Sequence, residues 1–111
     1  DAERVSVAGL ELDVVHAPGH TEGSVMFALD GVPVGVPDEA QVDRTLITGD
    51  VLFAGSIGRT DLPGGSHEAM MRSLRDAVAP RADSSLVLPG HGPATTLGRE
   101  KATNPYLQDI A

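Results

Sequence analysis

Two histidines and one aspartate stand in similar local contexts, each directly after a glycine that closes an apolar run. His20 and His91 each follow a Pro-Gly pair, and Asp50 follows a Thr-Gly pair. Imidazole and carboxylate groups are common protein ligands of divalent metal ions. Glycine relaxes the steric limits on the bend before each side chain. We therefore expect His20, Asp50 and His91 to meet at one metal-binding rim.

The segments that precede these residues have the patterns of β-strands. Residues 45–48 and 86–88 are short runs rich in aliphatic and β-branched residues. Residues 5–7 and 10–14 alternate apolar and polar side chains about Ala8-Gly9, which predicts a hairpin whose second strand continues to His16. Each candidate ligand then follows the end of a strand, where the backbone is held rigidly.

A further strand is predicted before this rim. Residues 25–29 form a continuous apolar run, which favours a strand buried on both faces. The Asp30-Gly31 pair predicts a turn into a return strand over residues 32–36, and Pro33 restricts that strand to an edge of the sheet. Residues 37–43 are polar and acidic and indicate a surface loop.

Two helices are expected in the second half of the chain. Ser66 is a suitable N-cap, and Pro80 ends the first helix. Its apolar face is predicted to consist of Met70, Met71, Leu74, Ala77 and Val78. Thr95 or Thr96 caps a last short helix that stops at Asn104-Pro105, and a long glycine-rich loop covers residues 55–65. Strands and helices together predict a layered α/β domain.

Composition narrows the classes of function. The 111 residues suffice for one small domain, and the formal net charge of −8 makes nucleic acid and anionic membranes unsuitable partners. No run is long and apolar enough to cross a bilayer. With no cysteine, any metal must be held by histidine and carboxylate, and a cytoplasmic location is expected.

Four segments together resemble the metallo-β-lactamase superfamily, and within it the glyoxalase II-like thioester hydrolases. They are APGHTEGS at 17–24, TGDVLF at 48–53, GRTDLPGG at 58–65 and PGHGP at 89–93. The resemblance implies the C-terminal half of an αββα sandwich and two divalent metal ions, zinc first, with iron or manganese as alternatives. It assigns His20 to the first metal, His91 to the second and Asp50, the catalytic carboxylate, to both.

The implied reaction is hydrolysis of a small thioester such as S-hydroxyacylglutathione by a metal-bound hydroxide. The sequence departs from the family in one respect, because the HxHxDH segment that supplies the other ligands is absent. We therefore expect residues 1–111 to be the C-terminal half of a domain, with an incomplete site and no activity alone. The missing N-terminal half, or another chain, would cover the half-sheet.

Arg59 lies where glyoxalase II-like enzymes have a basic residue that meets a glutathione carboxylate, so the resemblance makes it a candidate substrate ligand. An ion pair with Asp61 is the equally weighted alternative. His16 and His67 are expected to be structural and solvent-facing, respectively, and Thr21 and Ser24 to stabilise the bend around His20. Two other functions stay open, which are an iron-dependent persulfide dioxygenase of the same fold and a non-catalytic module that packs against another chain.

Overall fold

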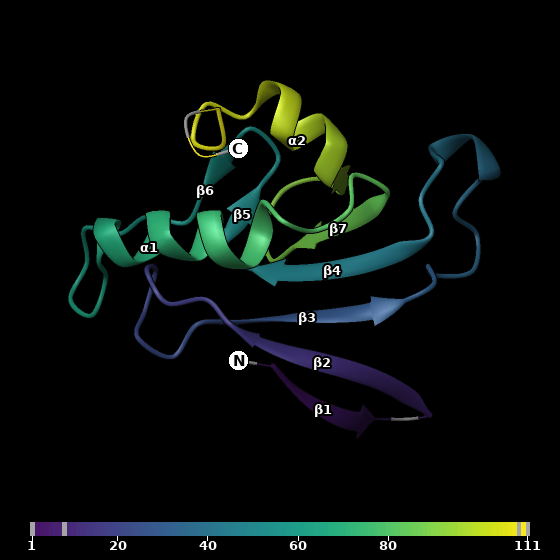
Figure 1. The fold of residues 1–111 in the computed structure, drawn as a ribbon, viewed down its shortest axis with the longest axis horizontal. Helices are drawn as coiled ribbons and strands as arrows, with labels where there is room; N and C mark the ends of the chain where they lie inside the picture. Colours follow the sequence, from purple (N-terminus) through teal and green to yellow (C-terminus); the bar gives the residue numbers. More distant parts are fainter. Residues whose placement is uncertain (1, 8, 109, 111) are drawn as a thin grey trace.

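A mixed sheet forms the centre of the protein in the computed structural model, which describes residues 2–7, 9–108 and 110 (Figure 1). The strand order is β1-β2-β3-β4-β7-β8, with β4 and β7 parallel and the other neighbours antiparallel. The strands are β1 (Ala2–Val7), β2 (Leu10–His16), β3 (Val25–Asp30), β4 (Arg44–Gly49), β7 (Ser85–Pro89) and β8 (Thr95–Thr96). A separate hairpin pairs β5 (Leu52–Phe53) with β6 (Ser56–Ile57).

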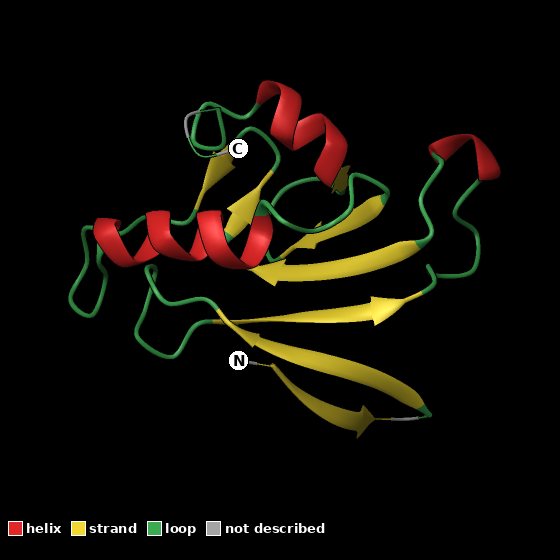
Figure 2. Cartoon of the chain, viewed as in Figure 1, coloured by secondary structure: helices red, strands yellow, loops and turns green. Residues whose placement is uncertain are grey.

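The two predicted helices are present, with the predicted caps (Figure 2). In α1 (His67–Ser73) the Ser66 hydroxyl accepts a hydrogen bond from the Ala69 N–H at 3.1 Å. The helix continues as a π-type segment, Leu74–Val78, and stops before Pro80, which cannot supply the next backbone donor. In α2 (Leu97–Thr103) it is Thr96, rather than Thr95, that caps, accepting from the Arg99 N–H at 3.2 Å.

One face of the sheet carries the core. Val15 is paired with Met26 across β2 and β3, and Leu46 with Val87 across β4 and β7, so their side chains point to the same face. The apolar face predicted for α1 packs against this face of the sheet, together with Leu97 of α2 and Leu107 beyond it. The fully buried members of this cluster include Met26, Leu46, Met70, Leu74, Val78, Val87, Leu97 and Leu107. The layered α/β fold class is therefore confirmed.

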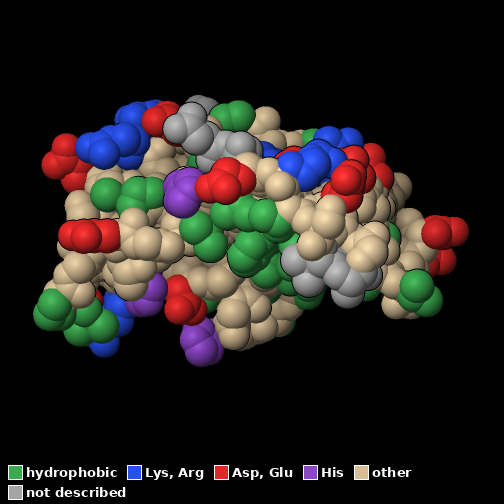
Figure 3. Space-filling model, turned by 90° about the horizontal axis from the view of Figure 1, so that it is seen from below, with side chains coloured by type: hydrophobic (Ala, Val, Ile, Leu, Met, Phe, Trp, Pro, Cys, Tyr) green, Lys and Arg blue, Asp and Glu red, His purple; other side chains and the backbone are tan. Residues whose placement is uncertain are grey.

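The other face of the sheet is apolar but only half-buried. Val14, Phe27, Ile47 and Leu88 are register partners from one strand to the next, and each keeps intermediate exposure. Figure 3 shows hydrophobic side chains gathered on the side of the molecule seen from below. The expectation that β3 is buried on both faces was wrong, because only the Met26 side packs against the helices, and no described residue covers the other side.

The predicted return strand at 32–36 is also absent. Residues 31–43 instead form a connection that contains a short 3-10 helix, Asp38–Ala40, and β3 pairs directly with β4. Pro33 offers no backbone donor, Gly35 has a φ of +98°, and the Val34 side chain is fully exposed. Local turn chemistry here outweighs the apolar pattern.

No helix among the described residues is long and apolar enough to span a bilayer.

Candidate metal centre

Three parallel strands deliver the candidate ligands to one edge of the sheet. Strand β2 runs antiparallel to β3, which runs antiparallel to β4, so β2 and β4 point the same way, as does β7. Their carboxyl ends therefore share an edge. His20 lies in the loop after β2, Asp50 directly after β4, and His91 shortly after β7. The structure thus brings the three residues together as the sequence predicted.

Asp50 lies between the two imidazoles and presents a different oxygen to each. Its Oδ2 is 3.5 Å from His20 Nε2, and its Oδ1 is 3.3 Å from His91 Nε2. Two ligands each about 2.0 to 2.1 Å from a tetrahedral ion lie roughly 3.4 Å apart. Each His–Asp pair is thus spaced as two ligands of one ion, and the donor set fits divalent metals.

Neither pair is a complete site within the described part of the chain. Those residues contain no group of three or more His, Cys, Asp or Glu placed to hold one metal ion. Two ligands leave a catalytic ion short of the three protein groups that it usually has. The geometry is therefore that of two half-sites sharing Asp50.

The ring of His20 is oriented by a backbone contact. Its Nδ1 lies 2.8 Å from the carbonyl oxygen of Arg59, and a carbonyl can only accept, so Nδ1 carries the proton. The lone pair of Nε2 then faces Asp50, which is the tautomer that a metal ligand requires. The His20 side chain is 23% exposed, whereas that of His91 is 79% exposed and meets the Phe53 ring edge-on at 6.0 Å.

Glycines allow the loops to close around Asp50, although not always for the predicted reason. Gly19 has a φ of +149°, and a Cβ there would lie 2.4 Å from Met70 Cα. Gly90 does not have a positive φ, so its role is close packing: a Cβ would lie 3.3 Å from Asp50 Oδ1. Gly58 was noted in the sequence only as a loop residue. A Cβ at Gly58 would overlap the Asp50 carbonyl oxygen at 1.8 Å.

Arg59 forms the local ion pair that was one of its two predicted roles. Its Nε and Nη2 donate to the two carboxylate oxygens of Asp61 at 2.8 and 3.0 Å, and both side chains are exposed. The Arg59 hydrogen bond lowers the pKa of the Asp61 carboxyl. A role of Arg59 in substrate binding stays a prediction, since its side-chain hydrogen bonds within the described residues go to Asp61.

The other histidines lie outside the cluster. The exposed His16 ring is 3.9 Å from a Glu3 carboxylate, and His67 is the exposed first residue of α1. The Thr21 N–H donates to the Ser24 hydroxyl at 3.1 Å, which stabilises the bend that carries His20, as expected.

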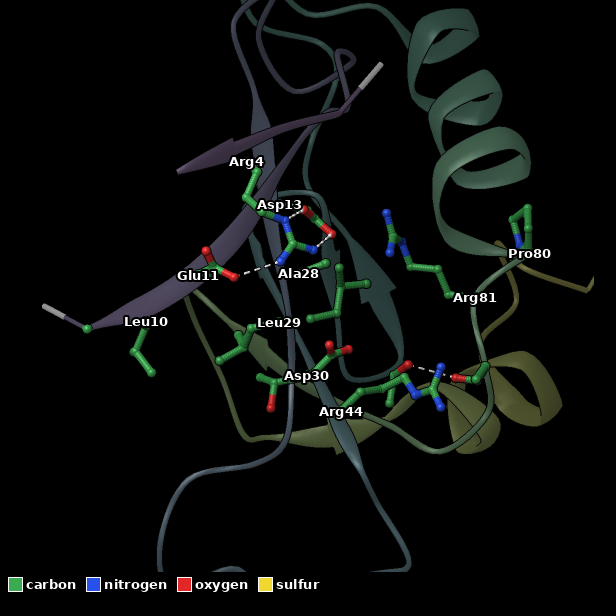
Figure 4. A pocket seen from close by; sticks show the side chains of 15 residues that line it. Arg4, Leu10, Glu11, Asp13, Ala28, Leu29, Asp30, Arg44, Pro80 and Arg81 are labelled. Atoms are coloured by element: carbon green, nitrogen blue, oxygen red, sulfur yellow. Dashed lines mark hydrogen bonds and ion pairs between the residues drawn. The ribbon is translucent and has the colours of Figure 1, made fainter. Parts of the chain in front are cut away.

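A cleft lies at the opposite end of the sheet (Figure 4). Its volume is about 740 Å³, and its polar lining includes Arg4, Asp13 and Arg81. Arg4 donates to Asp13 at 3.1 and 3.4 Å, and burial lowers the pKa of Arg81, whose Nε donates to the Ala77 carbonyl. No histidine lines this cleft. Its size does not make it the site of metal chemistry.

Comparison with known proteins agrees with this geometry. The family model described as "Metallo-beta-lactamase superfamily" matches residues 1–91. An uncharacterized protein of Mycobacterium tuberculosis is 40% identical over 112 residues, which is 100% of this chain and 47% of that protein. Hydroxyacylglutathione hydrolase GloC of Haemophilus influenzae is 38% identical over 107 residues, covering 96% of this chain and 45% of that protein. The chain thus spans about half the length of these curated relatives.

Solved structures show the same partial coverage. A B3 metallo-beta-lactamase, BLEG-1, superposes with a TM-score of 0.77 at 38% identity, over 94% of this chain and 44% of its own. TTHA1623 in a di-iron-bound form gives a TM-score of 0.69 at 41% identity, over 93% and 45%. ETHE1 from Myxococcus xanthus gives 0.75 at 30% identity, over 93% and 42%.

Proposed function

Because this chain belongs to the metallo-beta-lactamase superfamily, we propose that it provides half of a two-metal hydrolytic centre. His20 and Asp50 would hold one divalent ion, and Asp50 and His91 the other. The observation that carries this proposal is the opposed placement of the two Asp50 oxygens, each 3.3 to 3.5 Å from a different imidazole. A bridging carboxylate is what two closely spaced cations require.

When bound, two such ions would polarise a carbonyl group and lower the pKa of a water to about 7. The chain's own residues supply the geometry. Asp50 fixes the spacing of the two half-sites, and the Arg59 carbonyl holds His20 with Nε2 facing Asp50. Phe53 lies edge-on to the outer, exposed imidazole of His91.

We propose a small thioester of the S-hydroxyacylglutathione type as the substrate and zinc or iron as the metal. The similarity to hydroxyacylglutathione hydrolase GloC supports the substrate, and the similarity to a protein in a di-iron-bound form supports a two-metal site. The second candidate is an iron-dependent persulfide dioxygenase. It is favoured by the ligand types present, since mononuclear non-haem iron sites use histidine and carboxylate. The described residues place only two such groups around any one ion, so its further ligand would come from the rest of the domain.

The remaining ligands would come from the rest of the domain. We propose that residues 1–111 are its C-terminal half and that the N-terminal half packs on the exposed sheet face. That face is apolar across four strands, and burying such a surface stabilises a fold by roughly 25 cal/mol per Å². In this family the segment HxHxDH would then bring its ligands to the edge where Asp50 lies. Another chain on the same face is the alternative occupant.

The deciding experiment compares the isolated 111-residue chain with the longer protein that contains it. Metal content, hydrolysis of an S-hydroxyacylglutathione and oxygen uptake on a persulfide are measured for both. We expect two ions and thioester hydrolysis in the longer protein, and weak metal binding without turnover in the isolated chain. One iron per chain with oxygen uptake selects the dioxygenase, whereas a longer protein that binds no metal leaves the packing module.

A further inference from the structure

A buried carboxylate in α2 lies far from the histidines along the chain but contacts the segment that orients them. Glu100 is 1% exposed. It accepts hydrogen bonds from the Gly55 N–H and the Thr95 hydroxyl, both at 2.8 Å, and from Asn104 Nδ2 at 3.0 Å. A buried carboxylate without such partners is strongly destabilising. Gly55, Thr95 and Asn104 are therefore held in place against Glu100.

Asn104, one helical turn further, extends the same contact. Its fully buried amide donates from Nδ2 to the Ser56 carbonyl at 3.1 Å and more weakly to the Phe53 carbonyl at 3.4 Å. Its Oδ1 accepts from the Tyr106 N–H at 2.9 Å. Glu100 and Asn104 therefore hold the turn of the β5–β6 hairpin through its backbone, at three positions between 53 and 56.

That hairpin, together with the residues that directly follow it, contacts both imidazoles of the candidate metal centre. The Phe53 ring packs against His91, and the carbonyl of Arg59, two residues after β6, accepts from His20 Nδ1. The hairpin is also anchored beside Asp50, since the Thr48 hydroxyl donates to the Leu52 carbonyl at 2.7 Å and the Gly58 N–H to the Val51 carbonyl at 3.2 Å. A shift of the hairpin would move both rings relative to the carboxylate.

We infer that Glu100 and Asn104 are positioning residues for the metal centre, acting through the β5–β6 hairpin on the orientation of His20 and His91. This inference rests on the proposed function. Groups that orient metal ligands without touching the metal typically change metal affinity by about 10- to 100-fold when they are removed. The structure assigns that role to two side chains whose hydrogen bonds go to other described residues than His20, Asp50 and His91.

The test uses Glu100→Ala, Glu100→Gln and Asn104→Ala in the longer protein, with Lys101→Ala as the matched control. Lys101 lies on the same helix but ties it to the other side, donating to the Arg81 carbonyl at 2.6 Å and to Asp83 at 2.8 Å. Zinc affinity is measured by competition with a chelator. We expect Glu100→Ala and Asn104→Ala to weaken it about 10- to 100-fold. Glu100→Gln, which keeps the shape and most of the hydrogen bonds, and Lys101→Ala should stay close to wild type.

A second readout does not depend on metal. Nitrogen NMR of the metal-free protein reports whether His20 carries its proton on Nδ1, and we expect Glu100→Ala and Asn104→Ala to mix the two tautomers while Lys101→Ala does not. If the wild type binds neither zinc nor iron, the proposed function fails and this readout alone decides the inference. Loss of thermal stability with zinc affinity and tautomer both unchanged would show that α2 has only a structural role. If Glu100→Ala does not fold, Asn104→Ala decides between these outcomes.

Discussion

The two ends of the sheet treat their carboxylates differently. At the cleft end, Asp13 is held by Arg4, and Asp43 accepts from Arg44 and from the Ser84 hydroxyl. At the other end, the ion-pair partners of Asp50 among the described residues are the two imidazoles alone. These two carboxylates at the cleft end are thus paired with arginines of the protein itself. Among the described residues no Arg or Lys side chain is paired with Asp50, which is the arrangement that a bound metal ion would complete.

The backbone shows the same contrast. At the cleft end, a Cβ added to Gly9 or Gly31 would meet nothing within 4 Å. At the Asp50 end, a Cβ on Gly58 would lie 1.8 Å from the Asp50 carbonyl, and one on Gly90 would lie 3.2 Å from the Gly49 carbonyl. The proposed metal centre therefore coincides with an aspartate that has no Arg or Lys partner and with loops in close backbone contact, and it lies away from the cleft.

The largest effect is expected from removing the unmatched charge. Asp50→Asn in the longer protein keeps the side-chain volume but removes the anion that both half-sites share. We expect metal affinity and thioester turnover to fall by at least about 100-fold, with little change in the unfolding midpoint of the metal-free protein. Asp13→Asn at the cleft end is the matched control and should leave metal affinity and turnover unchanged. An unchanged rate in Asp50→Asn would remove this carboxylate from the proposed centre.

Closing the space at Gly58 should have the next largest effect. In Gly58→Ala the added methyl cannot coexist with the Asp50 carbonyl at 1.8 Å, so the backbone must move. We expect a loss of about 1 to 3 kcal/mol in the free energy of unfolding, together with weaker metal binding. Gly23→Ala is the control, since a Cβ there meets nothing within 4 Å and Gly23 does not have a positive φ. Equal stability of the two variants in urea would contradict the proposed packing.

Much of this comparison could be predicted from the sequence, because its signals are local. The strand-end positions of His20, Asp50 and His91, the Ser66 cap and the apolar face of α1 follow from short patterns. The return strand at 32–36 was wrong because Pro33 and Gly35 act on the backbone more strongly than the valines favour a strand. The β5–β6 hairpin was missed because two-residue strands have no periodicity.

The roles of Glu100 and Gly58 could not have been found from the sequence, because their partners are 45 and 8 residues away, respectively. A glutamate in an amphipathic helix is normally read as a solvent-facing residue. Nothing in its neighbourhood signals that a backbone turn will pack on it. The Asn104-Pro105 stop signal located the end of α2 correctly but did not indicate that Asn104 binds two carbonyls of the hairpin.

A smaller effect, on KM, is expected at the exposed Arg–Asp ion pairs, Arg59–Asp61 at the Asp50 end and Arg4–Asp13 at the cleft end. Arg59→Ala in the longer protein should raise KM severalfold for thioesters that carry a carboxylate, with kcat little changed, because a guanidinium suits uniform binding of such a group. Arg4→Ala, which breaks the Asp13 pair at the cleft end, should not change KM. Equal KM changes in Arg59→Ala for neutral and carboxylate-bearing thioesters would leave Arg59 only its pair with Asp61.

The smallest effect concerns acid stability at the cleft end. Hydrogen bonds from Arg44 and from Ser84 lower the pKa of Asp43 from 3.8 to about 2. The folded state thus binds its proton less readily than the unfolded chain, so the contribution of Asp43 to stability is complete above pH 3.8 and is lost as the pH falls toward 2. Thermal unfolding of wild type and Asp43→Asn should therefore differ slightly at neutral pH and converge in that acidic window. Ser84→Ala should bring the convergence at higher pH, because one of the two donors that lower the pKa is gone. A constant difference between wild type and Asp43→Asn across that window would mean that Arg44 and Ser84 do not stabilise the charged Asp43 carboxylate. The contrast between this paired carboxylate and Asp50 would then be wrong.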